Sequence, residues 1–285
     1  AVDPSTGAET GAQVIRQVYP RLGIVPGLIL APGWSQIPEV GLALAAKAAK
    51  INGVYSAMAL LDLDTAKAKK YTDTKSVKEE SGYTSPFCYP LWPCDRVGEY
   101  ILAKSAVAGA MIQYMASDNE DVLGVGGQCL EDGTEVYLDQ DQANTVNGYG
   151  VTTAINQNGY RLWGNYTGAY PASSDAKDIW FAVRRRFSWQ GNNFIQTYFD
   201  EVDDPMNNVL VQSVVDSENI RCSAYAPKYW AGASIEYKSD DNPKTAILAG
   251  TMKFRQHIAP YTPAQEIVDI IDYDTDTLAA AVGGN

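Results

Sequence analysis

Apolar runs and stretches with helical spacing alternate along the first part of the chain. Residues 22–30 and 54–63 are apolar runs that predict strands, and the second is hydrophobic enough for a strand buried on both faces. Residues 40–51 have the spacing of a helix, and we interpret Ser35 as its N-cap after a turn at residues 31–33. Strands separated by helices predict crossover connections and a mostly parallel sheet.

The same alternation continues toward the middle of the chain. Residues 65–71 are predicted as a short helix, residues 87–92 as a third strand and residues 97–116 as a longer helix. Residues 118–133 are acidic and glycine-rich without periodicity, which predicts a loop. Short elements joined by Asn-Gly turns follow over residues 137–163.

The last part of the chain has a different order of elements, which predicts an α+β arrangement. Residues 171–174 are the best linker candidate, and residues 178–186 alternate bulky with polar side chains. Two helices are predicted over residues 187–202 and 206–224, the second with Pro205 in its first turn. Apolar alternation or β-branched content then predicts three strands, over residues 231–238, 250–258 and 266–273.

The charge of the chain excludes some partners. Its 285 residues include 34 acidic and 22 basic side chains, for a net charge of −12. A field of this sign disfavours phosphate backbones, so we expect no nucleic-acid partner. No apolar run reaches the ~20 residues that cross a bilayer, so we expect a soluble protein made in the cytoplasm. The polar stretch before residue 12 is interpreted as a trimmed or processed start.

The four cysteines, Cys88, Cys94, Cys129 and Cys222, form no CxxC pair. This spacing indicates neither a zinc site nor a dense disulfide framework, and we predict reduced, mostly buried thiols. A bridge between Cys88 and Cys94 under oxidising conditions is the alternative. We expect no metal and no cofactor.

Two sequence motifs resemble catalytic sites. Asp62 and Asp64, at the end of a predicted strand, resemble the paired aspartates of haloacid-dehalogenase-type phosphatases, but Ala66 stands where that motif has threonine. Ser35 lies at a strand-to-helix turn, as in a nucleophile elbow, and the chain's one histidine, His257, is far away in the sequence. We therefore predict no catalytic residue, with a metal-dependent phosphatase using the two aspartates as the alternative.

One basic run stands out in this acidic chain. Arg184, Arg185 and Arg186 are consecutive and lie between apolar positions. One interpretation is a solvated face, or internal pairing with nearby acidic segments. The other is contact with an acidic partner, because arginine offers planar, bidentate donors.

Short phrases of the sequence, in a fixed order from about residue 20 to residue 273, resemble the contractile phage-type tail sheath family. They lie at residues 25–27, 30–35, 57–65, 147–151, 162–165, 183–187, 203–207 and 250–259. Each phrase alone is weak evidence, and the shared order carries the resemblance. The chain departs from the family in length, because its members normally carry an N-terminal arm and often an additional outer domain.

The resemblance implies a fold and a function. It implies a doubly wound, subtilisin-like α/β sheath domain over residues 1–172, with residues 1–20 as a leader or arm remnant. A smaller α+β C-terminal domain over residues 173–285 would then face an inner tube. The implied function is that of a structural subunit of the virion tail, which polymerises in the host cytoplasm and contracts. A bacteriocin or a cellular contractile injection system is the close alternative.

The resemblance also implies partners. They are further copies of the chain, the tail tube protein, and baseplate and tail terminator proteins, with no membrane insertion. We predict that the arginine run contacts the tube. We also predict that the last strand pairs with a neighbouring subunit, through Glu266, Ile267, Val268, Ile270, Ile271 and Tyr273.

Overall fold

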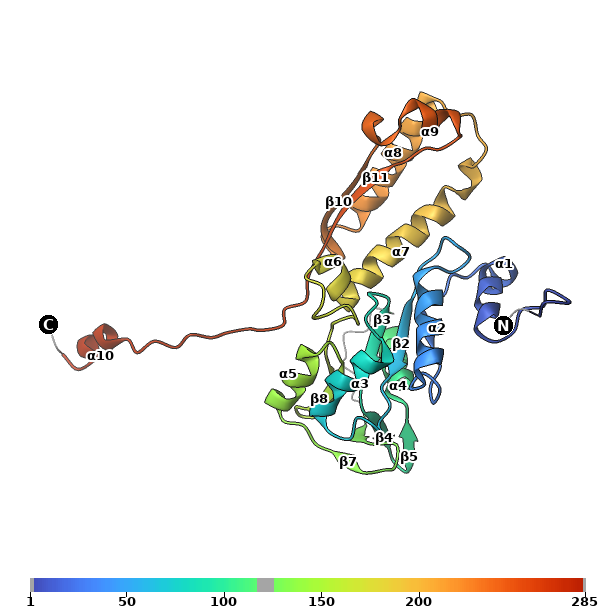
Figure 1. Cartoon of the computed structure of the whole chain (residues 1–285). Helices are drawn as coiled ribbons and strands as arrows, with labels where there is room; N and C mark the ends of the chain where they lie inside the picture. The colour runs from blue at the N-terminus through green and yellow to red at the C-terminus, as the bar shows by residue number, and fades with distance from the viewer. Residues whose placement is uncertain (1–2, 117–125, 284–285) are drawn as a thin grey trace.

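A three-stranded parallel sheet lies at the centre of the first part of the chain (Figure 1). In this computed structural model, which describes residues 3–116 and 126–283, the middle strand is β2 (Met58–Asp62). Strands β1 (Leu28–Leu30) and β3 (Cys88–Leu91) pair with it in parallel. All the residues of β2 are buried, as its continuous hydrophobicity predicts.

Helices cover both faces of this sheet. α2 (Pro38–Ala49) and α3 (Thr74–Ser81) pack on one face, and α4 (Lys104–Ala116) packs on the other. Successive residues of a strand point to opposite faces, so Leu61 joins the core under α2 and α3, whereas Leu60 joins the core under α4. The predicted α/β layering is therefore present around β2.

A second sheet contains four antiparallel strands in the order β5-β4-β6-β7. Its strands are β4 (Cys94–Val97), β5 (Tyr100–Leu102), β6 (Gly127–Cys129) and β7 (Glu135–Val136). The prediction of one helix over residues 97–116 is thus wrong at its start. The β4–β5 hairpin, with Gly98 at φ +62°, reverses the chain before α4 begins.

Three further sequence predictions need correction. The helix expected over residues 65–71 is absent; instead η2 (Tyr71–Asp73) leads into α3. Part of the loop expected over residues 118–133 forms β6, which pairs with β4 and β7. Residues 117–125 lie outside the described part of the chain. Ser35 is not the N-cap of α2, because that helix begins at Pro38 and the Ser35 hydroxyl donates its hydrogen bond to Asp62.

Shorter elements complete this part of the fold. η1 (Gly11–Gln17) and α1 (Val18–Leu22) pack near α2. α5 (Gln140–Gly148) precedes the hairpin of β8 (Thr153–Asn156) and β9 (Tyr160–Trp163). The predicted Asn-Gly turn of that hairpin is confirmed, because both of its residues have positive φ.

Long helices and a hairpin follow. α6 (Ala176–Ile179) and α7 (Phe181–Thr197) are followed by η3 (Phe199–Glu201) and α8 (Asn208–Ala224). α7 begins earlier than the helix predicted over residues 187–202, so the arginine run is helical. Pro205 precedes α8 instead of lying in its first turn.

The hairpin strands β10 (Trp230–Glu236) and β11 (Arg255–Pro260) pair antiparallel. η4 (Ser239–Asp241) and α9 (Lys244–Leu248) connect them, and α8 packs against β10. The strands expected over residues 231–238 and 250–258 are confirmed with shifted ends, since β11 starts later. Among the described residues, no helix is both long and apolar enough to cross a membrane.

The chain ends in an extended arm that leaves the body of the molecule (Figure 1). Residues 261–274 form neither strand nor helix, and α10 (Thr275–Ala281) lies at the end of this segment. The strand predicted over residues 266–273 is therefore absent in the single chain, because no sheet edge of the same molecule lies beside it.

α7 connects the two parts of the molecule. Phe181 stacks on Tyr89 of β3 with ring centroids 4.0 Å apart. Further along the helix, the Asn192 amide accepts a hydrogen bond from Ser56 N at 2.9 Å and donates one to Ser56 O at 2.7 Å. Apolar stacking and a pair of backbone hydrogen bonds thus hold the long helix against the first sheet.

A buried lysine stabilises the chain behind this sheet. Lys78 of α3 donates hydrogen bonds from Nζ to Tyr149 O at 2.9 Å and Tyr170 O at 2.5 Å. Burial lowers the pKa of Lys78 from its ordinary 10.5 to about 8. The Lys78 side chain therefore connects the end of α5, at Tyr149, with the segment around Tyr170.

This lysine predicts a rise in stability at alkaline pH. Because the folded pKa lies below the unfolded pKa, the unfolded chain holds more protons between about pH 8 and pH 10.5. The free energy of unfolding should rise by roughly 1–3 kcal/mol across this window relative to the Lys78→Met variant. Urea unfolding at several pH values measures the difference. Exposed Lys67→Met is the matched control, and equal pH slopes in wild type and Lys78→Met would contradict the prediction.

Candidate assembly surfaces and the Asp62 cluster

Asp62, the residue at the end of β2, lies in a buried polar cluster. Its side chain accepts hydrogen bonds from Ser105 N at 2.7 Å, Ser105 Oγ at 2.6 Å and Ser35 Oγ at 2.9 Å. Ser35 Oγ also accepts from Asp62 N at 3.0 Å. The carboxylate therefore joins β2, the turn after β1 and the first turn of α4.

Charges near this cluster are compensated inside the protein. Burial raises the pKa of Asp62, while the Ser105 and Ser35 hydrogen bonds and the Lys104 charge oppose the rise. Lys104 itself forms an ion pair with Asp95 at 2.6 Å, and both side chains are fully buried. Burial likewise raises the pKa of Asp95 against the opposing effect of Lys104. Such a pair is costly to break, because the remaining charge would be left without a partner.

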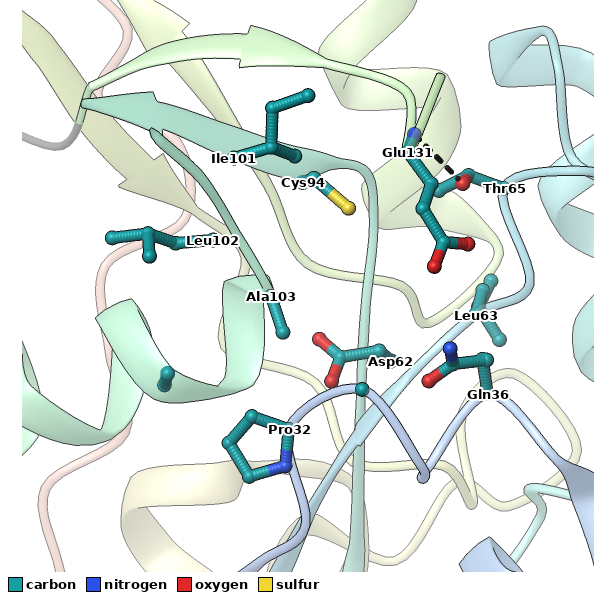
Figure 2. Close-up of a pocket in the computed structure, with 12 residues that line it drawn as sticks. Pro32, Gln36, Asp62, Leu63, Thr65, Cys94, Ile101, Leu102, Ala103 and Glu131 are labelled. Carbon is teal, nitrogen blue, oxygen red and sulfur yellow. Dashed lines mark hydrogen bonds between the residues drawn. The ribbon is translucent and has the colours of Figure 1, made fainter. Parts of the chain in front are cut away.

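The geometry does not support the phosphatase alternative. Both oxygens of Asp62 are occupied by hydrogen bonds, and Asp64 accepts one from Ala66 N at 2.9 Å within its own turn. Asp62 lines a pocket with Gln36 and Glu131, whereas Asp64 does not (Figure 2). Across residues 3–116 and 126–283, no group of three or more His, Cys, Asp or Glu side chains is placed to hold a metal ion. The cluster is built as a structural junction.

The arginine run lies at the start of α7, and all three side chains have partners within the chain. Arg184 pairs with Asp178 at 3.1 Å and lies over the Phe87 ring at 4.8 Å. Arg185 lies 5.7 Å from the Phe181 ring centroid. Burial lowers the pKa of Arg185, and the neighbouring Arg186 charge adds to this effect.

Arg186, the last of the run, faces the second part of the molecule. It lies 4.4 Å from the Tyr229 ring centroid and 5.5 Å from that of Trp189. Burial lowers its pKa too. All three guanidinium groups are half-buried, so the run combines internal stacking with a remaining solvent-facing surface. Internal pairing is thus found for Arg184, and contact with a tube remains a prediction.

The C-terminal arm carries a run of highly exposed apolar side chains. Ile267 is 89% exposed, Ile271 is 87% exposed and Ile270 is 80% exposed. Val268 and Tyr273 are also exposed. Just before this run, Asn147 Nδ2 donates a hydrogen bond to Gln265 Oε1 at 3.2 Å. The residues predicted to pair between subunits therefore form one accessible segment.

The β10–β11 hairpin offers edges on which such a segment fits. It is a two-stranded sheet, and in the described residues each strand pairs only with the other. Unpaired backbone donors and acceptors on an outer strand favour pairing with another strand. On β10, the Asn219 side chain already bonds the N–H and the C=O of Ile235. The structure thus contains an unpaired apolar segment and, on β11, a strand whose ladder partner among the described residues is β10 alone.

Sequence reasoning missed several of these features. No local signal identified the ion pair between Lys104 and Asp95, because their contact depends on the hairpin that precedes α4. The sequence predicts Ser35 as a helix cap, whereas its hydroxyl binds Asp62 in the structure. A strand-ending aspartate with serines on both flanking elements was the available signal for a buried junction.

The structure and surfaces are those of a mixed α/β protein with an exposed arm suited to assembly. In sequence, the chain is 24% identical to the tail sheath protein of Burkholderia phage BcepMu, over 99% of this chain and 62% of that protein. It is 22% identical to the tail sheath protein of Escherichia phage P2, over 92% of this chain and 66% of that protein. The chain therefore spans less than two thirds of the length of these relatives. No protein-family model matches the sequence.

Solved structures show the same fold. A chain of the PVC sheath complex of an extracellular contractile injection system, in the contracted state, superposes with a TM-score of 0.70 and 18% identity. The match covers 93% of this chain and 75% of that one. The predicted resemblance to the contractile tail sheath family is confirmed by these relatives and this fold.

Substitution of Asp62 tests its structural role. Asp62→Ala should lower the free energy of unfolding by about 2 kcal/mol or more, because buried Ser35 and Ser105 donors lose their acceptor. Asp64→Ala is the matched control two positions away, and its effect should stay below about 1 kcal/mol. Chemical denaturation measures both. An Asp62→Ala protein as stable as the Asp64→Ala protein would contradict the role as a junction.

Proposed function

We propose that this chain is part of a structural subunit of a contractile tail sheath, which polymerises around a tail tube and contracts to drive that tube through a target envelope. The names of the relatives and the shared fold support the class of function. The exposed C-terminal arm carries the proposal. An isolated apolar segment with unpaired backbone is unfavourable in water, and it becomes favourable when it pairs with another molecule.

In this proposal, residues 266–273 add a strand to the β10–β11 hairpin of a neighbouring copy. Backbone hydrogen bonds would supply the attachment and the alternating side chains would supply the register. Burying one isoleucine contributes about 2 kcal/mol, and the backbone hydrogen bonds add to this, so together they offset the roughly 1–2 kcal/mol per residue that ordering the segment costs. The assembly would remain connected through these arms while its subunits rearrange.

The remaining parts of the proposal concern architecture and partners. We infer a subtilisin-like α/β domain over residues 1–172 and a C-terminal domain over residues 173–285. The parallel sheet covered by helices on both faces supports the first, and the α8–β10 packing supports the second. The tube protein, baseplate and tail terminator are the proposed partners, with the virion tail as location. The occupied oxygens of Asp62 support a subunit without catalytic activity.

Two substitutions in the arm test assembly. Ile267 and Ile271 would share one face of a strand, so Ile267→Asp with Ile271→Asp should abolish sheath polymers when the protein is coexpressed with its tube protein. The melting temperature should stay unchanged, because both side chains are exposed in the single chain. Electron microscopy and sedimentation measure polymers.

The matched control for the arm is Glu266→Gln with Asp272→Asn, which alters polar residues of the same segment. This control should polymerise normally. Polymers of normal length from the double aspartate variant would show that the lattice does not depend on the arm.

The arginine run makes a separate prediction about the tube. The Arg185→Glu change leaves the ion pair between Arg184 and Asp178 intact. It should reduce tube attachment at least several-fold. Attachment of the wild-type protein should weaken as the salt concentration rises. Lys177→Glu, in α6 ahead of the run, is the control for the change in net charge. Cosedimentation with preformed tubes measures attachment. Unchanged attachment by a normally melting Arg185→Glu protein would place the tube contact elsewhere, with α8 as the next surface to test.

A further inference from the structure

Two cysteines lie opposite each other in the antiparallel sheet beside the Asp62 cluster. Strands β4 and β6 pair so that Cys94 faces Cys129 directly. Directly opposed residues in antiparallel strands have Cα atoms about 4.5–5.5 Å apart, with both side chains on the same face. Disulfides span Cα separations of about 4.4–6.8 Å. The register alone thus places this pair within bridging range.

The surroundings of the two thiols differ. Cys94 is half-buried and lines the pocket that also contains Asp62 and Glu131 (Figure 2). Cys129 is fully buried behind it and is one of the groups that act electrostatically on Cys94. A small reagent in the pocket therefore has access to the sulfur of Cys94, while Cys129 has access mainly to Cys94.

We propose that Cys94 and Cys129 form a cross-strand disulfide when the protein meets a small-molecule disulfide such as oxidised glutathione. The Cys94 thiolate attacks one sulfur of the reagent, which releases one reduced thiol and leaves a mixed disulfide on Cys94. The Cys129 thiolate then attacks the Cys94 sulfur and releases the second reduced thiol. Two protein thiols are oxidised, one small disulfide is reduced, and the two protons that the protein thiols lose end on the two released thiols.

The other cysteines lack this arrangement. Cys88 is buried in β3, whose described ladder partner is β2. Cys222 is buried in α8, with its sulfur 4.0 Å from a Glu218 oxygen.

Burial raises the pKa of Cys94 to about 12, so the thiolate fraction is small and the exchange is slow at neutral pH. The thiols consequently stay reduced in a reducing cell and are oxidised on long exposure outside it.

The direct test uses the full chain, reduced, freed of reductant and incubated with oxidised glutathione under native conditions. Intact mass spectrometry should show the loss of two hydrogen atoms without a retained glutathione. Proteolysis without reduction should then yield one linked peptide containing positions 94 and 129. A folded protein that gives no such peptide after prolonged incubation, or that links Cys88 to Cys94 instead, overturns the proposal.

Single variants resolve the order of the steps. Cys129→Ser should stop at a stable glutathione adduct on Cys94, and Cys94→Ser should take up little glutathione, because Cys129 is enclosed. The matched control, Cys88→Ser, should form the same linked peptide as wild type. Equal modification of Cys94→Ser and Cys129→Ser would contradict the access argument.

Thermal unfolding supplies a readout that does not depend on the variants. A disulfide across a loop of about 35 residues should raise the melting temperature by several degrees, reversed by dithiothreitol. An oxidised, correctly linked protein with a lower melting temperature would show that the bridge strains the sheet, and would overturn a native role for it.

Discussion

Burial of β2 on both faces is the constraint on which the rest of the first sheet depends. Each face of a five-residue strand can be covered only if helices pack from both sides. The strand then ends at Asp62, whose carboxylate receives hydrogen bonds from the turn after β1 and from the start of α4. The hydrophobic layer under α4 and the polar junction therefore both hold α4 against β2.

Features that depend on local pattern were predictable from the sequence. The uninterrupted hydrophobicity of β2 identified it as a doubly covered strand, and the Asn158-Gly159 pair identified the β8–β9 turn. α8 and β10 were also expected, each within two residues of its observed ends, whereas α7 begins six residues earlier and β11 five residues later than expected. In each case the short-range chemistry and the tertiary environment favour the same structure.

Features that depend on distant partners were not predictable. Residues 97–116 have the helical spacing of small apolar residues, yet the β4–β5 pairing, within the sheet that β4 forms with β6, makes the first of them strand residues. For the Asp62 cluster, sequence indicated a strand end with carboxylates but not the serines that bind them. Residues 266–273 show the reverse case, in which the strand pattern is present and its partner is absent from the same molecule.

The composition of the arm explains why it remains unpaired within its own chain. In an extended strand, Ile267, Ile271 and Tyr273 lie on one face, while Val268 and Ile270 lie on the other. Both faces are thus partly apolar, which suits a strand covered on two sides more than a solvated edge. The acidic residues between them and the net charge of −12 keep separate copies apart until specific pairing is available. In the assembly that we propose, attachment would then depend on directional backbone pairing.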